Sequence, residues 1–268
     1  LARTAKGLGN VMMSPDDDGV YRRIPIVSAY GGRFLPSLPL SVAKDLLGVQ
    51  KMSLDASKRL HLGPIAVPLE ENGAMLVKYH GGARTYRYYS IAGLIQSLVH
   101  LEEGAEPIIP PEEFRDKIVL VGLTAPGLFD LKPSPFSSVY PGVEVHATAI
   151  DNILHGDFLT RAGVGTLLFL VCGLSVICGI GVSYSIRLRV SLPLVGVCAS
   201  VPLIVAVMSF KGGVWVDLVA PEAGILATFG LTSLISYSTE GRRIRKASTT
   251  MRRWKLFRGP GREACIRL

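Results

Sequence analysis

The chain has 268 residues and a formal net charge of +8, and this charge is unevenly distributed along it. Residues 1–161 carry 16 basic and 17 acidic side chains, whereas residues 239–268 carry 10 basic and 2 acidic ones. Basic flanks beside apolar spans are what membrane topology requires, so the charge does not indicate nucleic acid as a partner. All four cysteines lie after residue 161, which excludes a disulfide framework in the first part of the chain.

Residues 9–30 are predicted to form a β-hairpin. Its turn is Ser14–Gly19, which ends in a glycine suited to a positive φ angle. The three aspartates of this turn lack the alternating acidic positions and the distant glutamate of an EF-hand, so they indicate a plain turn rather than a calcium loop. Arg22 and Arg23 follow on the return strand, where we expect solvated charges rather than pairs with inner carboxylates.

A helix is predicted at residues 36–47, with Gly48 as its stop. Its expected core-facing residues are apolar: Leu38, Val42, Ala43, Leu46 and Leu47. Residues 59–79 read as two or three short strands, and Glu71–Gly73 contains the Asn-Gly pair of a type I′ hairpin turn.

An aromatic cluster follows at Tyr86, Tyr88 and Tyr89, and we favour strand packing as its role over an aromatic ligand platform. Ser90 is suited to cap a helix that ends near Leu101. Four apolar residues of this helix recur at helical spacing and are expected to face inward: Ile91, Leu94, Ile95 and Leu98.

The segment from Lys117 to Leu154 organises the first part of the chain. Ile118–Val121 is an apolar, largely β-branched run too short for a helix, so it predicts a strand buried on both faces. A loop rich in Gly, Pro and Ser follows from Thr124 to Tyr140. A helix then covers residues 143–154, with its expected core positions at Val143, Ala147, Ile150 and Leu154. This order of elements predicts an α/β (or α+β) domain with at least one parallel connection.

Ligands of open α/β sheets usually bind at the carboxyl ends of strands, which here is the loop after residue 121. The candidate ligand-binding residues are Thr124 and Asp130 in this loop, and Glu144 and His146 at the start of the next helix. A purely structural loop remains the alternative. Glu144 and His146 are two positions apart and do not share a helix face, so they do not indicate a metal site. No catalytic or cofactor motif appears, and we expect neither a cofactor nor a catalytic residue in this chain.

After Arg161 the chain changes to long apolar runs, each able to cross about 30 Å of hydrocarbon. Residues 162–238 are predicted to form an all-α bundle of three transmembrane helices, at about 164–184, 190–210 and 219–238. Small residues lie one turn apart in the first and third spans: Ser175 and Gly179, then Gly224 and Thr228. Such residues suit close contacts between helices.

Three blocks occur in a defined order: NVMMSPDDDGVYRRIPIV, KIVLVGLTAPGLFDL and PSPFSSVYPGVEVHATAIDNIL. Together they resemble the extracytoplasmic CHASE domain of the second type (cyclases/histidine kinases associated sensory extracellular). The resemblance covers roughly Gly7–Arg161 and continues into three hydrophobic spans. It implies an N-terminally truncated sensor domain at residues 1–161 and a basic cytoplasmic tail at residues 239–268.

The resemblance further implies a bacterial multi-pass receptor of the inner membrane, embedded in the lipid bilayer and present as a homodimer. Such a receptor senses an unknown small-molecule or protein signal outside the cytoplasm and relays it to a cytoplasmic output. That output is most often an adenylate/guanylate cyclase and less often a histidine or Ser/Thr kinase. The tail is too short for such a domain, so the chain is expected to be a fragment that is not itself an enzyme.

Two other functions stay open: an enzyme that uses the loop at residues 124–140, and a small membrane assembly or transport protein. No nucleophile–base pair is visible in that loop, and the spans lack the inward charges that mark ion or substrate paths. Arg187, Arg189 and the tail lie on one side of the predicted spans. The positive-inside rule therefore predicts that the tail is cytoplasmic and that residues 1–161 lie outside.

The tail also carries an amphipathic pattern. Residues 242–257 are predicted to form a basic helix that lies on the inner leaflet, with its apolar positions on one face. Simple disorder is the alternative.

Overall fold

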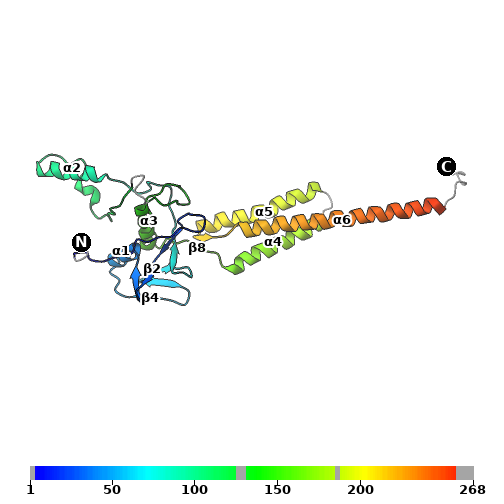
Figure 1. The fold of residues 1–268 in the computed structure, drawn as a ribbon, viewed down its shortest axis with the longest axis horizontal. Coiled ribbons are helices and arrows are strands. Elements are labelled where there is room, and N and C mark those ends of the chain that lie inside the picture. Colours follow the sequence, from blue (N-terminus) through cyan, green and yellow to red (C-terminus); the bar gives the residue numbers. More distant parts are fainter. Residues whose placement is uncertain (1–3, 125–130, 185–187, 258–268) are drawn as a thin grey trace. The chain divides into compact units, whose positions relative to one another are not determined.

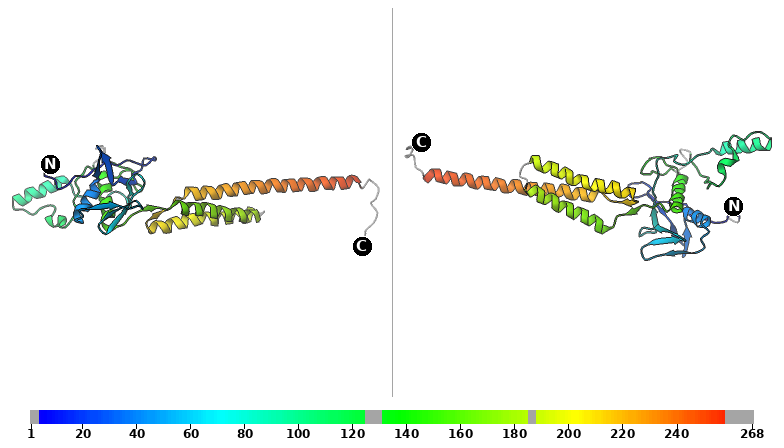
Figure 2. Two further views of the ribbon diagram at one scale, coloured as in Figure 1. Left: turned by 90° about the horizontal axis from the view of Figure 1, so that it is seen from below. Right: turned by 180° about the vertical axis from the view of Figure 1, so that it is seen from behind.

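The computed structural model describes residues 4–124, 131–184 and 188–257. The chain divides into two compact units, Leu1–Thr160 and Arg161–Leu268. The first unit contains small sheets and short helices, and the second contains three long helices (Figures 1 and 2).

The first unit is a mixed α/β domain, as predicted. Its helices are α1 (Leu38–Leu46), α2 (Ile91–Glu102), the 3₁₀ helix η1 (Pro111–Phe114) and α3 (Gly142–His155). Its strands are β1 (Arg23–Pro25), β2 (Val27–Tyr30), β3 (Arg33–Pro36), β4 (Met52–Leu54), β5 (Arg59–Leu62), β6 (Ile65–Pro68), β7 (Ala74–Leu76) and the start of β8 (Thr160–Arg161). The sheets β1–β7, β2–β3 and β4–β5–β6 are all antiparallel. None of these three sheets contains the predicted parallel connection, and the parallel pairing that the structure describes is an isolated bridge between Asn10 and Ser37.

Helix α3 lies at the centre of the core of this unit. Its residues Val145, Ala149 and Ile153, four positions apart, are fully buried against residues of β1, β7 and α1 such as Ile24, Met75 and Leu40. The predicted helix is confirmed, and its predicted core face is right at Ile150, which is 3% exposed. The other predicted members, Val143, Ala147 and Leu154, are only half-buried, because Val145, Ala149 and Ile153 form the stripe that packs on the core.

Helix α1 is confirmed at Leu38–Leu46, where Ser37 caps the helix by accepting a hydrogen bond from the Leu40 N–H. Its core residues are Leu40 and Ala43 together with Pro39. Leu46 and Leu47 were expected in the core but are exposed.

The predicted turn at Ser14–Gly19 is present, with Gly19 at φ +80°, but it does not close a hairpin. Its return strand β1 pairs instead with β7. The sequence predicted solvated charges at Arg22 and Arg23, and this prediction is wrong. Arg22 bonds to Asp16 at 3.0 Å and to Asp18 at 2.8 Å, and Arg23 bridges Asp16 and Glu70 at 2.5 Å each. The acidic turn folds back over β1, so its carboxylates neutralise both cations.

The pair of Asp18 and Arg22 should persist to strongly acidic pH. The hydrogen bond from Arg22, followed by one from the Val20 N–H, lowers the pKa of Asp18 from its ordinary value of 3.8 to about 2. Because the folded state has the lower pKa, the contribution to stability is complete above the ordinary value and is lost as pH falls toward 2. The thermal midpoint of Arg22→Gln should therefore lie below that of the unchanged chain at about pH 5, and this gap should shrink at about pH 2. A gap of equal size at both pH values would contradict the assignment.

The Glu71–Gly73 turn is also real but does not make a hairpin. Gly73 has φ +76°, and its N–H donates to the Glu70 carbonyl at 3.0 Å. The turn connects β6 to β7, which belong to different sheets. The strands predicted at residues 59–79 are confirmed as β5, β6 and β7.

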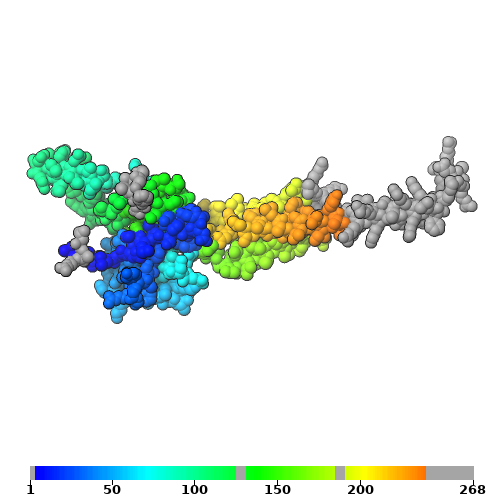
Figure 3. Space-filling model, in the orientation of Figure 1, coloured from blue at the N-terminus to red at the C-terminus, as the bar shows by residue number. Residues whose placement is uncertain are grey.

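Helix α2 is confirmed near its predicted bounds, but it does not face inward. Ile91, Ile95 and Leu98 are 63%, 58% and 56% exposed. Figure 3 shows this segment, in teal, as a lobe that projects from the rest of its unit. Its contacts are with the chain that returns beside it, where the Ser97 hydroxyl accepts a hydrogen bond from the Ile109 N–H at 2.9 Å. The helical spacing of its apolar residues predicted a buried face, but spacing alone does not show whether another element packs against that face.

The second unit contains α4 (Val164–Tyr184), α5 (Leu188–Lys211), β9 (Val214–Trp215) and α6 (Val219–Phe257). Three segments are long and apolar enough to cross a membrane: Val164–Tyr184, Ser191–Lys211 and Val219–Thr239. They match the predicted spans. Helix α6 continues without a break through residues 242–257, so the predicted helix there is confirmed, and its place on the inner leaflet stays a prediction.

Small residues bring α4 and α6 together, as their spacing suggested. A Cβ added at Gly224 would lie 3.0 Å from the Ser175 hydroxyl oxygen, and one at Gly179 would lie 3.1 Å from the Thr228 methyl carbon. The two pairs face each other across one helix–helix contact. The close approach of the backbones thus depends on glycine at both sites.

One end of the second unit is held by a polar cluster. Arg161 pairs with Asp217 at 3.0 Å, and its guanidinium lies 5.4 Å from the centre of the Trp215 ring. The Ala162 N–H donates to the Trp215 carbonyl at 2.8 Å. These contacts fix the start of α4 beside the start of α6.

Candidate groove in the first unit

The segment Lys117–Thr124 has no regular secondary structure, so it is not the buried strand that the sequence predicted. It belongs to no sheet, and Val119 and Val121 are 53% and 86% exposed. One face packs on α3, because a Cβ at Gly122 would meet the Val143 Cβ at 2.6 Å. A short apolar run carries no information about which distant residues would pair with it or cover it.

A groove of about 1120 Å³ runs beside this segment. Its floor includes Val143, Glu144 and Ala147 of α3, and its opposite wall is formed by residues 84–91. Most of the remaining lining is apolar: Leu94, Pro110, Phe114, Ile118, Val119, Leu120, Val121 and Gly122. Charged side chains also line it: Arg84, Arg87, Lys117, Glu112 and Glu113. The groove can therefore hold an apolar group and orient it through polar groups at its rim.

Glu144 fixes the wall of the groove to its floor. Its side chain is buried, with the residue 2% exposed, and its carboxylate accepts hydrogen bonds from the Thr85 N–H at 2.8 Å, the Arg84 N–H at 3.1 Å and the Tyr88 hydroxyl at 2.6 Å. Burial, and after it the bond to Glu144, raises the pKa of Tyr88, so this hydroxyl remains a donor. The carboxylate is therefore committed to structure rather than open to a ligand.

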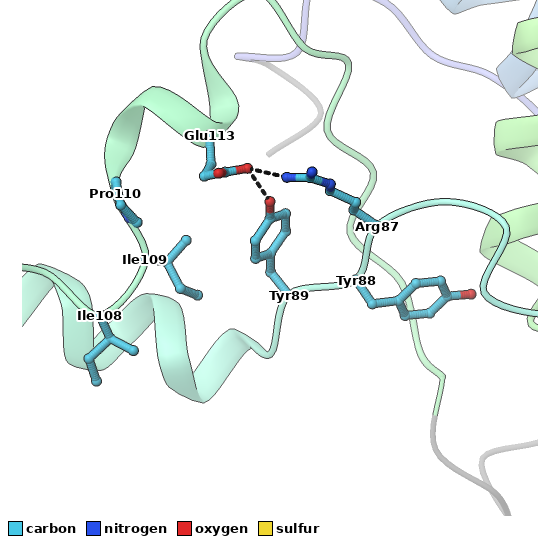
Figure 4. Close-up of a pocket in the computed structure, with 7 residues that line it drawn as sticks. All are labelled: Arg87, Tyr88, Tyr89, Ile108, Ile109, Pro110 and Glu113. Atoms are coloured by element: carbon cyan, nitrogen blue, oxygen red, sulfur yellow. Dashed lines mark hydrogen bonds and ion pairs between the residues drawn. The ribbon is translucent and has the colours of Figure 1, made fainter.

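A second carboxylate organises the mouth of the groove (Figure 4). Glu113 accepts from the Tyr89 hydroxyl at 2.6 Å and from the Arg87 guanidinium at 2.8 Å. The bond from Tyr89, followed by the charge of Arg87, lowers the pKa of Glu113. The Tyr89 ring also contacts Phe114, with their centres 5.0 Å apart. Arg87, Tyr89 and Glu113 border a smaller hollow of about 340 Å³.

The structure places the four predicted site residues differently. Thr124 lines the groove, and Glu144 lies at its floor with its carboxylate occupied. His146 is buried in α3 and is not part of the lining, while Asp130 lies outside the described residues.

The sequence interpretation missed the tyrosine cluster as part of a site. Tyr86, Tyr88 and Tyr89 do not lie in a strand, so the prediction of strand packing was wrong, and all three line the groove. The alternation of aromatic residues with Arg87 just before a helix is the signal that could have indicated a polar, aromatic wall.

A mixed α/β domain that precedes three membrane-length helices, with an apolar groove in that domain, is the architecture of a membrane sensor module. A family model for the CHASE2 domain matches residues 2–181, which is more than half of the chain. The chain therefore belongs to the CHASE2 domain family, whose members are sensor domains rather than catalytic ones. No match was found among curated proteins or among solved structures.

Proposed function

We propose that this chain is the sensing and membrane-spanning part of a bacterial receptor whose output is a cytoplasmic adenylate or guanylate cyclase. A histidine or Ser/Thr kinase is the second candidate for that output. One observation carries the proposal: the CHASE2 match at residues 2–181 covers the first unit and most of α4, and two further helices of membrane length follow it. The sensor would comprise residues 1–161, the spans residues 162–238, and the tail residues 239–268.

In this proposal the sensor lies outside the cytoplasm and the tail lies inside, at the inner membrane. Arg187, Arg189 and the tail place the larger number of basic residues on one side of the spans, which favours that side as cytoplasmic. The cluster of Arg161 and Trp215 then lies at the outer interface, where tryptophan is enriched in membrane proteins.

Helix α6 offers a path for the signal. Its 39 residues correspond to about 58 Å, whereas the hydrocarbon core is about 30 Å thick. A helix of this length can carry a displacement from the outer interface into the cytoplasm without a joint. A receptor of this kind would act as a homodimer, in which two such helices transmit the change to a paired output.

The signal, a small molecule or a protein segment, is proposed to bind in the groove, with Thr124 at its rim. Glu144 supports the site from below, because its carboxylate holds the wall at residues 84–88 in place. Arg84, Arg87 and Lys117 would contact polar groups of the signal.

A ligand screen can test the groove as the site. Compounds and peptides that raise the thermal midpoint of the detergent-solubilised chain should lose this effect in Ala147→Trp, whose indole fills the groove floor. Ser57→Trp, at an exposed turn between β4 and β5, is the matched control and should retain the effect. A stabilising compound that acts equally on the unchanged chain and on Ala147→Trp would place the site elsewhere.

A further inference from the structure

Helix α2 contacts the chain that follows it through its small and polar side chains. A Cβ added at Gly93 would lie 3.3 Å from the Cδ1 atom of Ile109, and the Ser97 hydroxyl accepts a hydrogen bond from the Ile109 N–H at 2.9 Å. About one turn further on, the Nδ1 atom of His100 lies 3.0 Å from the Glu106 carbonyl oxygen. The returning chain therefore covers the helix face that carries Gly93, Ser97 and His100.

The opposite face of α2 is apolar and exposed. Ile91, Ile95 and Leu98, named here the α2 stripe, follow one another at intervals of four and three residues and so share one side of the helix. More than half of each of these residues is exposed. This is the reverse of the usual arrangement, in which the apolar side of a surface helix packs on the core. A contiguous apolar face that a folded domain leaves in water marks a surface for a partner.

The charge around the α2 stripe determines which kind of partner fits it. No lysine or arginine occurs between Arg87 and Arg115, whereas five glutamates do: Glu102, Glu103, Glu106, Glu112 and Glu113. Glu102 follows Leu98 by four residues and thus continues the line of the stripe. It is exposed, as is Glu103 beside it. The apolar face therefore ends in negative charge.

These charges disfavour two of the conceivable occupants. Anionic lipid surfaces attract amphipathic helices that carry lysine and arginine, and they repel a helix that carries glutamates instead. A second copy that paired through the same face would bring from its own α2 no lysine or arginine to meet these glutamates, and like charges in one interface oppose binding. The complementary surface is apolar and basic.

We propose that the α2 stripe binds an amphipathic helix of a second protein, whose apolar side covers the stripe and whose lysines or arginines meet Glu102 and Glu103. The stripe offers contacts at i, i+4 and i+7, the spacing by which amphipathic helices are recognised. This partner is additional to the signal proposed for the groove, because Ile95 and Leu98 lie outside the lining of that groove. Failure of this proposal would leave the groove proposal standing.

Two peptides of matched design test the assignment on the full chain in nanodiscs of zwitterionic lipid. Both peptides are amphipathic helices with leucine at i, i+4 and i+7 on one side, and the basic peptide has lysine wherever the acidic peptide has glutamate. Fluorescence anisotropy, with empty nanodiscs as the blank, measures the dissociation constants. The basic peptide should bind about tenfold more tightly than the acidic one, and high salt should reduce this difference.

Substitutions show whether the peptide binds at the α2 stripe. Leu98→Gln removes an apolar contact and retains a good helix former, so it should weaken binding of the basic peptide by about tenfold. Leu54→Gln, at a similarly exposed apolar position in β4, is the matched control and should leave the affinity unchanged. The double variant Glu102→Gln, Glu103→Gln should lose most of the preference for the basic peptide.

Several results would overturn the proposal. They are an absence of binding by the basic peptide, equal affinities for the two peptides, and an affinity that Leu98→Gln leaves unchanged. The remaining occupants are tested with the same variant. If the chain binds vesicles of anionic lipid and Leu98→Gln does not, the face belongs to a lipid surface. If nanodiscs that each hold one chain associate and those with Leu98→Gln do not, it belongs to a second copy.

Discussion

Glu144→Ala should lower the free energy of unfolding of the first unit by about 3 kcal/mol. The change removes the acceptor of four hydrogen bonds, from three N–H groups and the Tyr88 hydroxyl. Buried donors left unpaired cost about 1–3 kcal/mol each, but water can reach those at the exposed Arg84 and Tyr88. The sum is therefore well below four full penalties.

Graded variants identify the source of this loss. Tyr88→Phe deletes one donor and leaves the three N–H bonds in place, so it should cost about 1 kcal/mol. Glu144→Gln keeps the size of the side chain and one acceptor oxygen, so its loss of stability should fall between those of the other two variants. Denaturant unfolding of the solubilised chain measures all three. If Glu144→Ala proves no more harmful than Tyr88→Phe, the carboxylate does not hold the wall of the groove.

Gly224→Leu should weaken the contact between α4 and α6 by about 2 kcal/mol. The added side chain would meet the Ser175 hydroxyl at 3.0 Å and the Val171 side chain at 3.2 Å, counted from its first carbon alone. In a lipid environment, close backbone approach replaces the hydrophobic effect as the source of helix association. The two helices must therefore separate or rotate to accept the leucine.

The same helix provides the control for this prediction. An added Cβ at Gly230 meets no atom within 4 Å, so Gly230→Leu should leave the contact intact. Titration of the chain with SDS, followed by tryptophan fluorescence, should show unfolding of Gly224→Leu at a lower SDS fraction than Gly230→Leu. Equal midpoints for the two variants would mean that the small residues do not determine this packing.

The parts of the fold that the sequence predicted are those with a local physical signal. The spans follow from uncharged apolar length, and α3 follows from helical spacing that begins after Pro141-Gly142. Small residues at Gly179 and Gly224 indicated close helix contacts, because only small side chains allow such an approach.

The parts that it missed depend on partners distant in the chain. The apolar run at 118–121 predicted a buried strand, but the segment forms no strand and is largely exposed, because pairing and burial depend on distant residues. Arg23 was expected in solvent, yet it meets Glu70, 47 residues away. Glu144 was a candidate ligand contact because it lies near a strand end, and its true partners come from residues 84–88. A single sequence shows neither of these pairings.

The orientation of the chain in the membrane tests the account most directly. Ser57→Cys introduces a thiol into the first unit, which has no native cysteine, and Cys265 reports on the tail. In intact cells, a membrane-impermeant thiol reagent should label the cysteine at position 57, and Cys265 should react only after the cells are permeabilised. If position 57 resists the reagent in intact cells while Cys265 reacts, the first unit faces the cytoplasm and the chain is not a sensor of extracytoplasmic signals.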